Sequence, residues 1–407
     1  MKRVNEMVKV LKGKKIFTGY EVIHDGCVVI DGEKIVGVGM ESKMHIPDKS
    51  DIIDFGDNTI LPGLIDSHTH LALSAQMPNY AATMKDDTLT LTLRAARNIR
   101  CDLLSGVTTM RCLGEKDFID VAIKDAVEKE LIPGPRLLIS GKGIRSSYGH
   151  GIMGTPFDGV EEVRKAARIN IHDAGADQVK VFVTGSKGEF RNFKFGTERT
   201  VERNEMQSLM TKEEIQAAVE TAHCVGKKVA AHCYGGVGLK HCVEAGVDTI
   251  EHGIYMDDDD IEMMLKAKAW LTVTQNGYLS DQRIINRGTP ELTKGFVKFR
   301  DDVRAAYTKA VHSGLRYALG TDGNHGGFAY ELETLVGFNI EPMKALQAAT
   351  TEAACMCGVD EKVGSLEAEK FADILVVDGD PLTTMSDITK VTAVFKGGRR
   401  MDDISQW

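Results

Sequence analysis

The sequence predicts an α/β protein in which a (β/α)8 TIM barrel carries a small β-sandwich domain built from both chain ends. Between residues 61 and 357, short apolar runs alternate with longer amphipathic helical segments, as in eight consecutive βα units. On both sides of this region, β-branched runs are separated by Gly, Asp and Asn, which indicates short antiparallel strands. We therefore expect the barrel over 61–357 and the small domain over 1–60 and 358–407.

The length and the net charge of the chain limit the kinds of molecule that it can be expected to bind. At 407 residues the chain is too long for one ordinary domain, and its net charge of −9 argues against nucleic acid, which requires a basic surface. No apolar run approaches the length of a membrane span, and the first residues lead into no apolar signal region. We therefore expect a cytoplasmic homo-oligomer that acts on a small molecule, with no membrane partner. The eight cysteines form no C-x-x-C pair and are expected to be reduced.

The small domain accounts for the first and last elements. Short runs rich in β-branched and aromatic residues occur at 14–18, 27–31, 34–38 and 51–55. After a helix predicted at 341–357, similar runs return at 374–377 and 391–396. We expect these last strands to complete the sheet begun by the first 60 residues.

The barrel accounts for the middle of the chain. Its eight strands are predicted at 63–70, 106–112, 136–139, 178–183, 228–232, 249–252, 270–274 and 316–321. Helices are predicted between them at 89–104, 117–130, 161–174, 212–225 and 296–313. The acidic run at 257–260 is expected to begin another helix, where carboxylates favour the helix dipole.

Two histidines end the first predicted barrel strand. Side chains alternate along a strand, so His68 and His70 share one face with Asp66. Imidazoles on one face suit a divalent metal, but two polar residues where a strand meets its loop would give the same pattern.

Four later strands also end in a single polar or charged side chain. Taken alone, Lys180 can extend from its strand to solvent, His232 and His252 can be hydrogen-bonded core residues, and Asp322 can cap the next segment. Active sites of such barrels lie where the strands end. Together with His68 and His70, these residues therefore predict a metal site at the mouth of the barrel.

The chain resembles the amidohydrolase superfamily over nearly its whole length, and six segments carry the resemblance. They are PGLIDSHTH at 62–70, VKVFVTG at 179–185, AAHCYG at 230–235, IEHG at 250–253, LGTDG at 319–323, and VGSLEAEKFADILVVDGDP at 363–381. Within that superfamily, the chain is most similar to the imidazolonepropionase-like proteins, which include Xaa-Pro dipeptidases. It departs from the usual pattern at Glu369, just before Lys370, and at Ser186, where relatives commonly have Gly.

The resemblance implies two divalent metal ions, usually Zn²⁺. His68, His70 and Asp322 would hold the first ion, and His232 and His252 the second. Lys180 would bridge them after reaction with carbon dioxide, because the carbamate offers oxygen ligands whereas an ammonium group has no lone pair.

The expected activity is hydrolysis of a C–N amide bond, in a dipeptide or an N-acyl amino acid, by a metal-bridging hydroxide. Asp322 is the expected general base. His150 is a candidate oxyanion donor and Tyr234 a candidate substrate contact, although a surface histidine and rim packing are the ordinary alternatives. The charged loop at 186–209, with Arg191, Lys194, Arg199 and Arg203, could clamp a substrate carboxylate or be a solvated loop.

Other functions compete with this one. The same site could open a cyclic amide such as an imidazolone or a lactam. Deamination of a heterocycle is less favoured, because deaminases of this superfamily typically lack the lysine seen at Lys180 and carry His-x-x-Glu where His232 precedes Cys-Tyr-Gly. A non-catalytic relative would lack a ligand, and an aldolase would use Lys180 as a Schiff base.

Overall fold

The fold is seen in a computed structural model, which describes residues 7–147, 149–185, 207–286 and 290–401. The predicted loop at 186–209, with its four basic residues, lies almost wholly outside these residues. Within the described part of the chain, no helix combines the length and apolar composition that crossing a bilayer requires. A cytoplasmic location remains a prediction.

Parallel strands form the centre of the molecule. One sheet has the order β6-β7-β8, and the other has the order β10-β9-β11-β12-β13-β14-β15. Every pairing in both sheets is parallel. The bounds are β6 Leu64–Thr69, β7 Val107–Cys112, β8 Arg136–Leu138, β9 Ile144–Arg145, β10 Thr155–Pro156, β11 Gln178–Phe182, β12 Lys228–Cys233, β13 Thr249–His252, β14 Trp270–Val273 and β15 Tyr317–Leu319.

Backbone hydrogen bonds join the two sheets at both edges. The Asp322 N–H, just beyond β15, donates to the His68 carbonyl oxygen on β6 at 2.8 Å. On the other side, the Asp177 N–H, just before β11, donates to the Ile139 carbonyl oxygen, just beyond β8, at 2.8 Å. The ends of all these parallel strands therefore meet on one side of the molecule.

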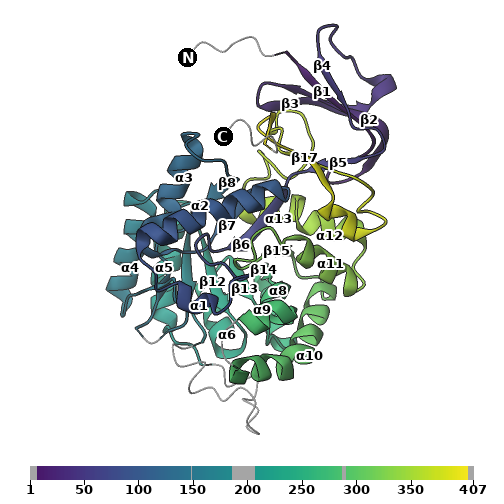
Figure 1. Cartoon of the computed structure of the whole chain (residues 1–407). Coiled ribbons are helices and arrows are strands. Elements are labelled where there is room, and N and C mark those ends of the chain that lie inside the picture. Colours follow the sequence, from purple (N-terminus) through teal and green to yellow (C-terminus); the bar gives the residue numbers. More distant parts are fainter. Residues whose placement is uncertain (1–6, 148, 186–206, 287–289, 402–407) are drawn as a thin grey trace.

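Helices surround the parallel strands in Figure 1. They are α1 Tyr80–Thr83, α2 Thr88–Leu104, α3 Ile119–Glu128, α4 Val160–Arg168, α5 Lys212–His223, α6 Gly236–Ala245, α7 Asp258–Ala267, α8 Gln275–Leu279, α9 Asp281–Asn286, α10 Pro290–His312, α11 Ala329–Gly337, α12 Pro342–Ala348 and α13 Thr351–Cys357. The acidic run does begin a helix, because Asp257 and Asp260 form a capping box at the start of α7. The prediction of an α/β fold with parallel strands is confirmed.

The helix predicted at 341–357 is two helices. The chain leaves the helical conformation at Thr350, between α12 and α13, where φ is −134° and ψ is −90°. The preceding carbonyl, of Ala349, accepts a hydrogen bond from the Ile65 N–H at 2.8 Å. The break therefore supplies a backbone partner to β6, the strand that carries His68.

A third sheet is built from both chain ends. Its order is β18-β17-β16-β5-β1-β2-β3, with β4 also paired to β1, so β5 joins the N-terminal strands to the C-terminal ones (Figure 1). The bounds are β1 Lys9–Phe17, β2 Val22–Asp31, β3 Lys34–Met40, β4 Asp51–Asp54, β5 Thr59–Pro62, β16 Ile374–Val377, β17 Val391–Lys396 and β18 Arg399–Arg400. The domain limits at residues 60 and 358 remain predictions.

Apolar packing fixes this terminal sheet against the parallel strands. Leu61 of β5 and Leu375 of β16 belong to the same buried cluster as Leu64 of β6 and Leu103 of α2. On the strands themselves, Leu11, Val28 and Phe395 form a separate buried cluster. The terminal sheet therefore packs near the beginning of β6. The carboxyl ends of the parallel strands, where the candidate ligands lie, are left for the functional site.

We expect Gly320→Ala to destabilise the protein. A Cβ atom at Gly320 would lie 2.4 Å from the His68 Cβ and 2.8 Å from the His68 backbone nitrogen. Backbone must move to relieve such overlap, and overpacking of this kind typically costs about 1–3 kcal/mol. Denaturant unfolding of the metal-free protein measures the change.

Gly337→Ala is the matched control. A Cβ atom at Gly337, in the last turn of α11, would meet no described atom within 4 Å. It should leave the unfolding free energy unchanged or raise it by up to about 1 kcal/mol. Equal stability of the two variants would show that β15 does not pack on β6 as closely as described.

Candidate metal centre

Three predicted ligands meet at the ends of β6 and β15. The Asp322 Oδ1 lies 3.6 Å from the His68 Nε2 and 3.7 Å from the His70 Nε2. One possible ligand atom from each residue lies within 4.8 Å of the other two. Two imidazole nitrogens and a carboxylate oxygen at such separations can hold one divalent ion.

The other predicted ligands lie beside this group. The ring centroids of His232 and His252 are 4.6 Å apart, and those of His68 and His252 are 4.7 Å apart. Lys180 is wholly buried on β11; burial is the main cause of the lowered pKa of His68 and of His252, and the nearby Lys180 charge lowers both further. All six predicted ligands therefore share one end of the parallel strands.

The two predicted substrate-contacting residues also reach this place. The His150 ring stacks on the His232 ring, with centroids 4.3 Å apart and planes inclined by 19°. The Tyr234 ring lies 4.6 Å from that of His232. The structure thus places both beside the second set of ligands, and their roles in catalysis remain predictions.

The buried polar atoms here fit metal ions. The His68 Nε2, the His232 Nε2 and the Lys180 Nζ are inaccessible to solvent and have no hydrogen-bond partner among the described residues. Buried polar atoms are rarely left unpaired in native proteins. Buried imidazole nitrogens that converge without hydrogen-bond partners are the expected chemistry of a divalent metal site.

Burial also sets the protonation of the ligands. It lowers the pKa of His70 to about 3, and it lowers the pKa values of His68, His232 and His252 as well. These imidazoles are therefore neutral near pH 7 and keep a lone pair for a metal. Burial lowers the pKa of Lys180 to about 8, which favours the neutral amine that can react with carbon dioxide.

Hydrogen bonds to the far ring nitrogens orient three of the imidazoles. The Nδ1 of His68 contacts Glu251 Oε2 at 2.7 Å, that of His70 contacts the Gly114 carbonyl oxygen at 2.9 Å, and that of His252 contacts Thr274 Oγ1 at 2.8 Å. A histidine that donates through Nδ1 keeps its Nε2 lone pair for a metal. The first two of these acceptors fix that tautomer.

Two of the candidate ligands adopt left-handed backbone conformations, with φ of 75° at His252 and 52° at Asp322. Residues other than glycine seldom adopt such conformations, which persist where surrounding contacts impose them. At Asp322 the backbone N–H bonds to His68 and the backbone carbonyl accepts from Arg283. The strain is therefore held by contacts that also aim the carboxylate at the two histidines.

A model of the amidohydrolase family matches residues 59–401. The chain belongs to the amidohydrolase family. The ochratoxinase of Aspergillus niger is 27% identical, over 93% of this chain and 83% of its own length. The imidazolonepropionase of Micrococcus luteus is 24% identical, over 93% of this chain and 94% of its own length.

Solved structures support the same placement of this amidohydrolase. A Xaa-Pro dipeptidase with bound methionine in its active site is 28% identical, with a TM-score of 0.83 over 97% of this chain and 99% of its own. A prolidase complexed with N-methylphosphonate-L-proline is 25% identical, with a TM-score of 0.84 over the same shares. The predicted superfamily and subgroup are confirmed.

Sequence reasoning missed two residues that the structure adds to the site. Arg283 on α9 donates from Nη2 to Asp322 Oδ2 at 2.9 Å and to the Asp322 carbonyl oxygen at 2.8 Å. The Tyr278 ring on α8 lies 5.8 Å from the His252 ring, and its hydroxyl lies 3.5 Å from that of Tyr234. Both follow β14 by several residues, so a search confined to strand ends does not find them.

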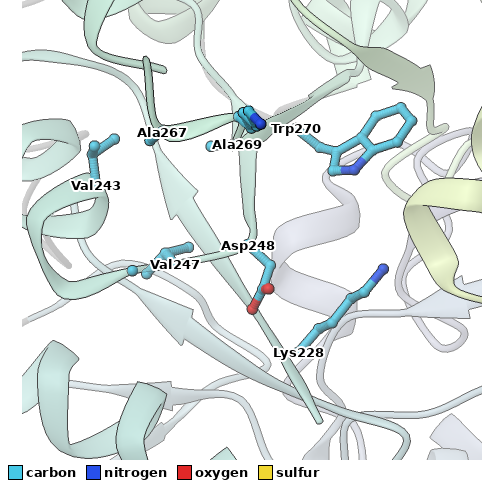
Figure 2. Close-up of a pocket in the computed structure, with 9 residues that line it drawn as sticks. Lys228, Val243, Val247, Asp248, Ala267, Ala269 and Trp270 are labelled. Carbon is cyan, nitrogen blue, oxygen red and sulfur yellow. The ribbon is translucent and has the colours of Figure 1, made fainter. Parts of the chain in front are cut away.

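A depression elsewhere on the molecule is not part of the site. Figure 2 shows Lys228, Asp248 and Trp270 among the residues that line it. These three residues lie at the beginnings of β12, β13 and β14, whereas the candidate ligands lie at strand ends. Two of its charged groups already have partners: Lys228 donates to the Met356 carbonyl oxygen and Asp248 accepts from the Val229 N–H, both at 2.7 Å. These contacts are structural.

A buried ion pair braces the loop that follows His70. His325 places Nδ1 2.7 Å from Asp102 Oδ2 and Nε2 2.9 Å from the Leu73 carbonyl oxygen. Both ring nitrogens face acceptors, so both donate and the imidazole is charged. Burial alone would lower the pKa of His325, but the attraction and the hydrogen bond of Asp102 outweigh burial and raise it.

We expect the stabilisation from this pair to fade as the pH rises. A raised folded-state pKa means that the contribution is complete below about pH 6.5 and is lost as the pH passes the folded pKa of His325. Removing one partner of a buried pair typically costs about 3–5 kcal/mol. The free energy of unfolding of His325→Gln should therefore lie well below the wild-type value in acid and approach it in base.

The measurement is denaturant unfolding of metal-free protein across that pH range. His172→Gln is the control, because His172 is exposed and pairs with an exposed Asp173. A deficit in His325→Gln that stays constant with pH would show that His325 is neutral in the folded protein.

Proposed function

We propose that this amidohydrolase is a binuclear metal enzyme that cleaves the amide bond of a dipeptide or an N-acyl amino acid. Membership of the family already makes it a hydrolase of C–N bonds. The observation that carries the proposal is the convergence of His68, His70 and Asp322 beside the buried Lys180. The similarity to a Xaa-Pro dipeptidase and an ochratoxinase supports an amide next to an amino acid as the substrate.

The residues divide into two ligand sets in this proposal. His68, His70 and Asp322 would hold one ion, His232 and His252 would hold the other, and Lys180, as a carbamate, would supply oxygen ligands to both. When bound, two divalent ions, here Zn²⁺, lower the pKa of a shared water and polarise the scissile carbonyl.

Asp322 is suited to move the proton. Its Oδ2 is held by Arg283, while its Oδ1 faces the histidines. A carboxylate held in this way can accept the proton of the attacking water and pass it to the leaving nitrogen. His150 then donates to the developing oxyanion, and Tyr234 binds the substrate beside it.

The proposal includes the wider architecture. We take the two parallel sheets to be one (β/α)8 barrel, supported by the backbone hydrogen bond from Asp322 to His68 that links its last strand to its first. We take the terminal sheet to be the small sandwich domain. A homo-oligomer in the cytoplasm, with no nucleic-acid or membrane partner, completes the proposal.

Opening of a cyclic amide is the second candidate. The similarity to an imidazolonepropionase, over 93% of this chain, favours it specifically. Heterocycle deamination has less support, because Lys180 is present and buried among the ligands. If only cyclic amides are turned over, the second candidate replaces the first.

We expect Asp322→Asn to lower amide turnover by about 10²–10⁴-fold, the usual contribution of a general acid–base group. The amide is close in shape to the carboxylate but does not accept a proton at neutral pH. The assay measures amino acids released from dipeptide and N-acyl-amino-acid libraries by the zinc-loaded protein. Asp301→Asn, an exposed change on α10, is the control.

Two outcomes would contradict the proposal. The first is full turnover by a protein that contains no metal and works in chelator. The second is reduction of a substrate adduct on Lys180 by borohydride, which would indicate a Schiff base in place of hydrolysis.

We expect assembly of the second metal site to require carbon dioxide. Protein stripped of metal and carbon dioxide should take up its full complement only after bicarbonate is added. Since burial lowers the pKa of Lys180 to about 8, more amine is neutral above that pH. At fixed dissolved carbon dioxide, uptake should therefore be faster above about pH 8 than below it.

Lys180→Met tests the same step. It keeps an unbranched side chain but has no amine, so its metal uptake should be incomplete and indifferent to bicarbonate. Metal analysis after gel filtration gives the stoichiometry. Wild-type uptake that ignores bicarbonate would rule out the carbamate.

A further inference from the structure

We propose that Glu251, held in place by Arg111, is a positioning residue that fixes the His68 ring for metal binding. This inference rests on the proposed metal function and adds residues to which neither the motif nor the family match gives a role. Glu251 is wholly buried on β13, and its Oε2 lies 2.7 Å from the His68 Nδ1. A carboxylate at that nitrogen accepts a proton and leaves Nε2 as the metal-facing lone pair.

Arg111 holds the other oxygen of Glu251. From β7, its Nη2 donates to Glu251 Oε1 at 2.8 Å, and the Thr249 hydroxyl donates to the same oxygen at 2.5 Å. Both carboxylate oxygens are thus engaged, one by His68 and one by these donors. The carboxylate is therefore fixed at the point where His68 needs it.

The guanidinium of Arg111 is itself anchored on three strands. Its Nε donates to the Ser67 carbonyl oxygen on β6 at 2.5 Å, and its Nη1 donates to the Thr249 hydroxyl on β13 at 3.2 Å. Its Nη2 also donates to the Thr272 hydroxyl on β14 at 3.1 Å. Because Arg111 belongs to β7, its buried side chain links four strands beside the candidate ligands. The planar guanidinium, with five N–H donors, can make these several hydrogen bonds at once.

This support is specific to one metal site. Among the three candidate metal ligands whose Nδ1 contacts are described, His68 is the one that contacts a carboxylate; His70 contacts a backbone carbonyl and His252 a hydroxyl. A loss at Glu251 should therefore weaken the site of His68, His70 and Asp322. The site of His232 and His252 should be affected less.

Glu251→Gln tests this in the full chain. The amide is isosteric, but Arg111 can only donate, so the amide oxygen should face Arg111 and the NH2 group should face the His68 Nδ1, which then loses its acceptor. We expect one of the two zinc equivalents to bind about 10–100-fold more weakly, as is usual when the partner of a ligating histidine is removed. Competition with a zinc-binding dye measures both equivalents in turn.

A second readout follows the His68 ring directly. In metal-free protein with ¹⁵N-labelled histidine, the wild-type His68 ring should carry its proton on Nδ1. In Glu251→Gln the ring signals should move toward a mixture of tautomers. A role in stability alone would not change this tautomer.

Asp120→Asn is the matched control. Asp120 is another wholly buried carboxylate, but it accepts from the Ser140 and Gly141 N–H groups and touches no candidate ligand. Both zinc affinities should stay at the wild-type level in this variant. Should Glu251→Gln fail to fold, Arg111→Lys keeps the charge, loses the fork and should weaken the same equivalent.

The outcomes separate the two proposals. Wild-type protein that binds no zinc overturns the proposed function. Wild-type protein that binds two equivalents, with both affinities and the His68 tautomer unchanged in Glu251→Gln, overturns only the positioning role. If only Arg111→Lys folds, unchanged zinc affinities in that variant overturn it.

Discussion

The candidate metal centre depends on the contact between β6 and β15, the first and last of the parallel strands. Asp66 accepts from the Thr321 N–H and hydroxyl at 3.0 and 2.6 Å and from the His68 N–H at 3.1 Å. These bonds hold two strands far apart in sequence at one register, which brings Asp322 to the histidines. Burial raises the pKa of Asp66 to about 7, so this join is made at a considerable desolvation cost.

Local patterns were sufficient to predict the α/β fold with parallel strands and to select six candidate ligands that the structure brings to one end of those strands. Alternation along a strand placed His68 and His70 on one face, and a lone charged residue ending an apolar run marked Lys180 and Asp322. These patterns predict a shared site because the carboxyl ends of parallel strands lie on one side of the sheet, however far apart the strands are in the sequence. These candidate ligands can therefore be selected without any distance, from the knowledge of which strands end on the same side.

The remaining features are set by tertiary contacts that leave no periodic trace. Arg283 belongs to a short helix between strands, and nothing local shows that it reaches Asp322. The left-handed conformation of His252 and the break at Thr350 are likewise imposed by neighbours, against local preference. Glu251 directly precedes His252 in the sequence. Its proposed role in positioning His68 can be inferred only from the tertiary structure, in which Arg111 on β7 contacts it.

Buried charges and unpaired polar groups at the candidate metal centre carry a free-energy cost when no metal is bound. Arg111, Glu251, Arg283 and Asp322 form two ion pairs around neutral imidazoles, while the Lys180 amine has no hydrogen-bond partner among the described residues. Conversion of that amine to a carbamate would add a negative charge, which only cations at the ligand atoms can balance. In the proposed site, lysine modification and metal binding would therefore be coupled, because each would remove the electrostatic cost of the other.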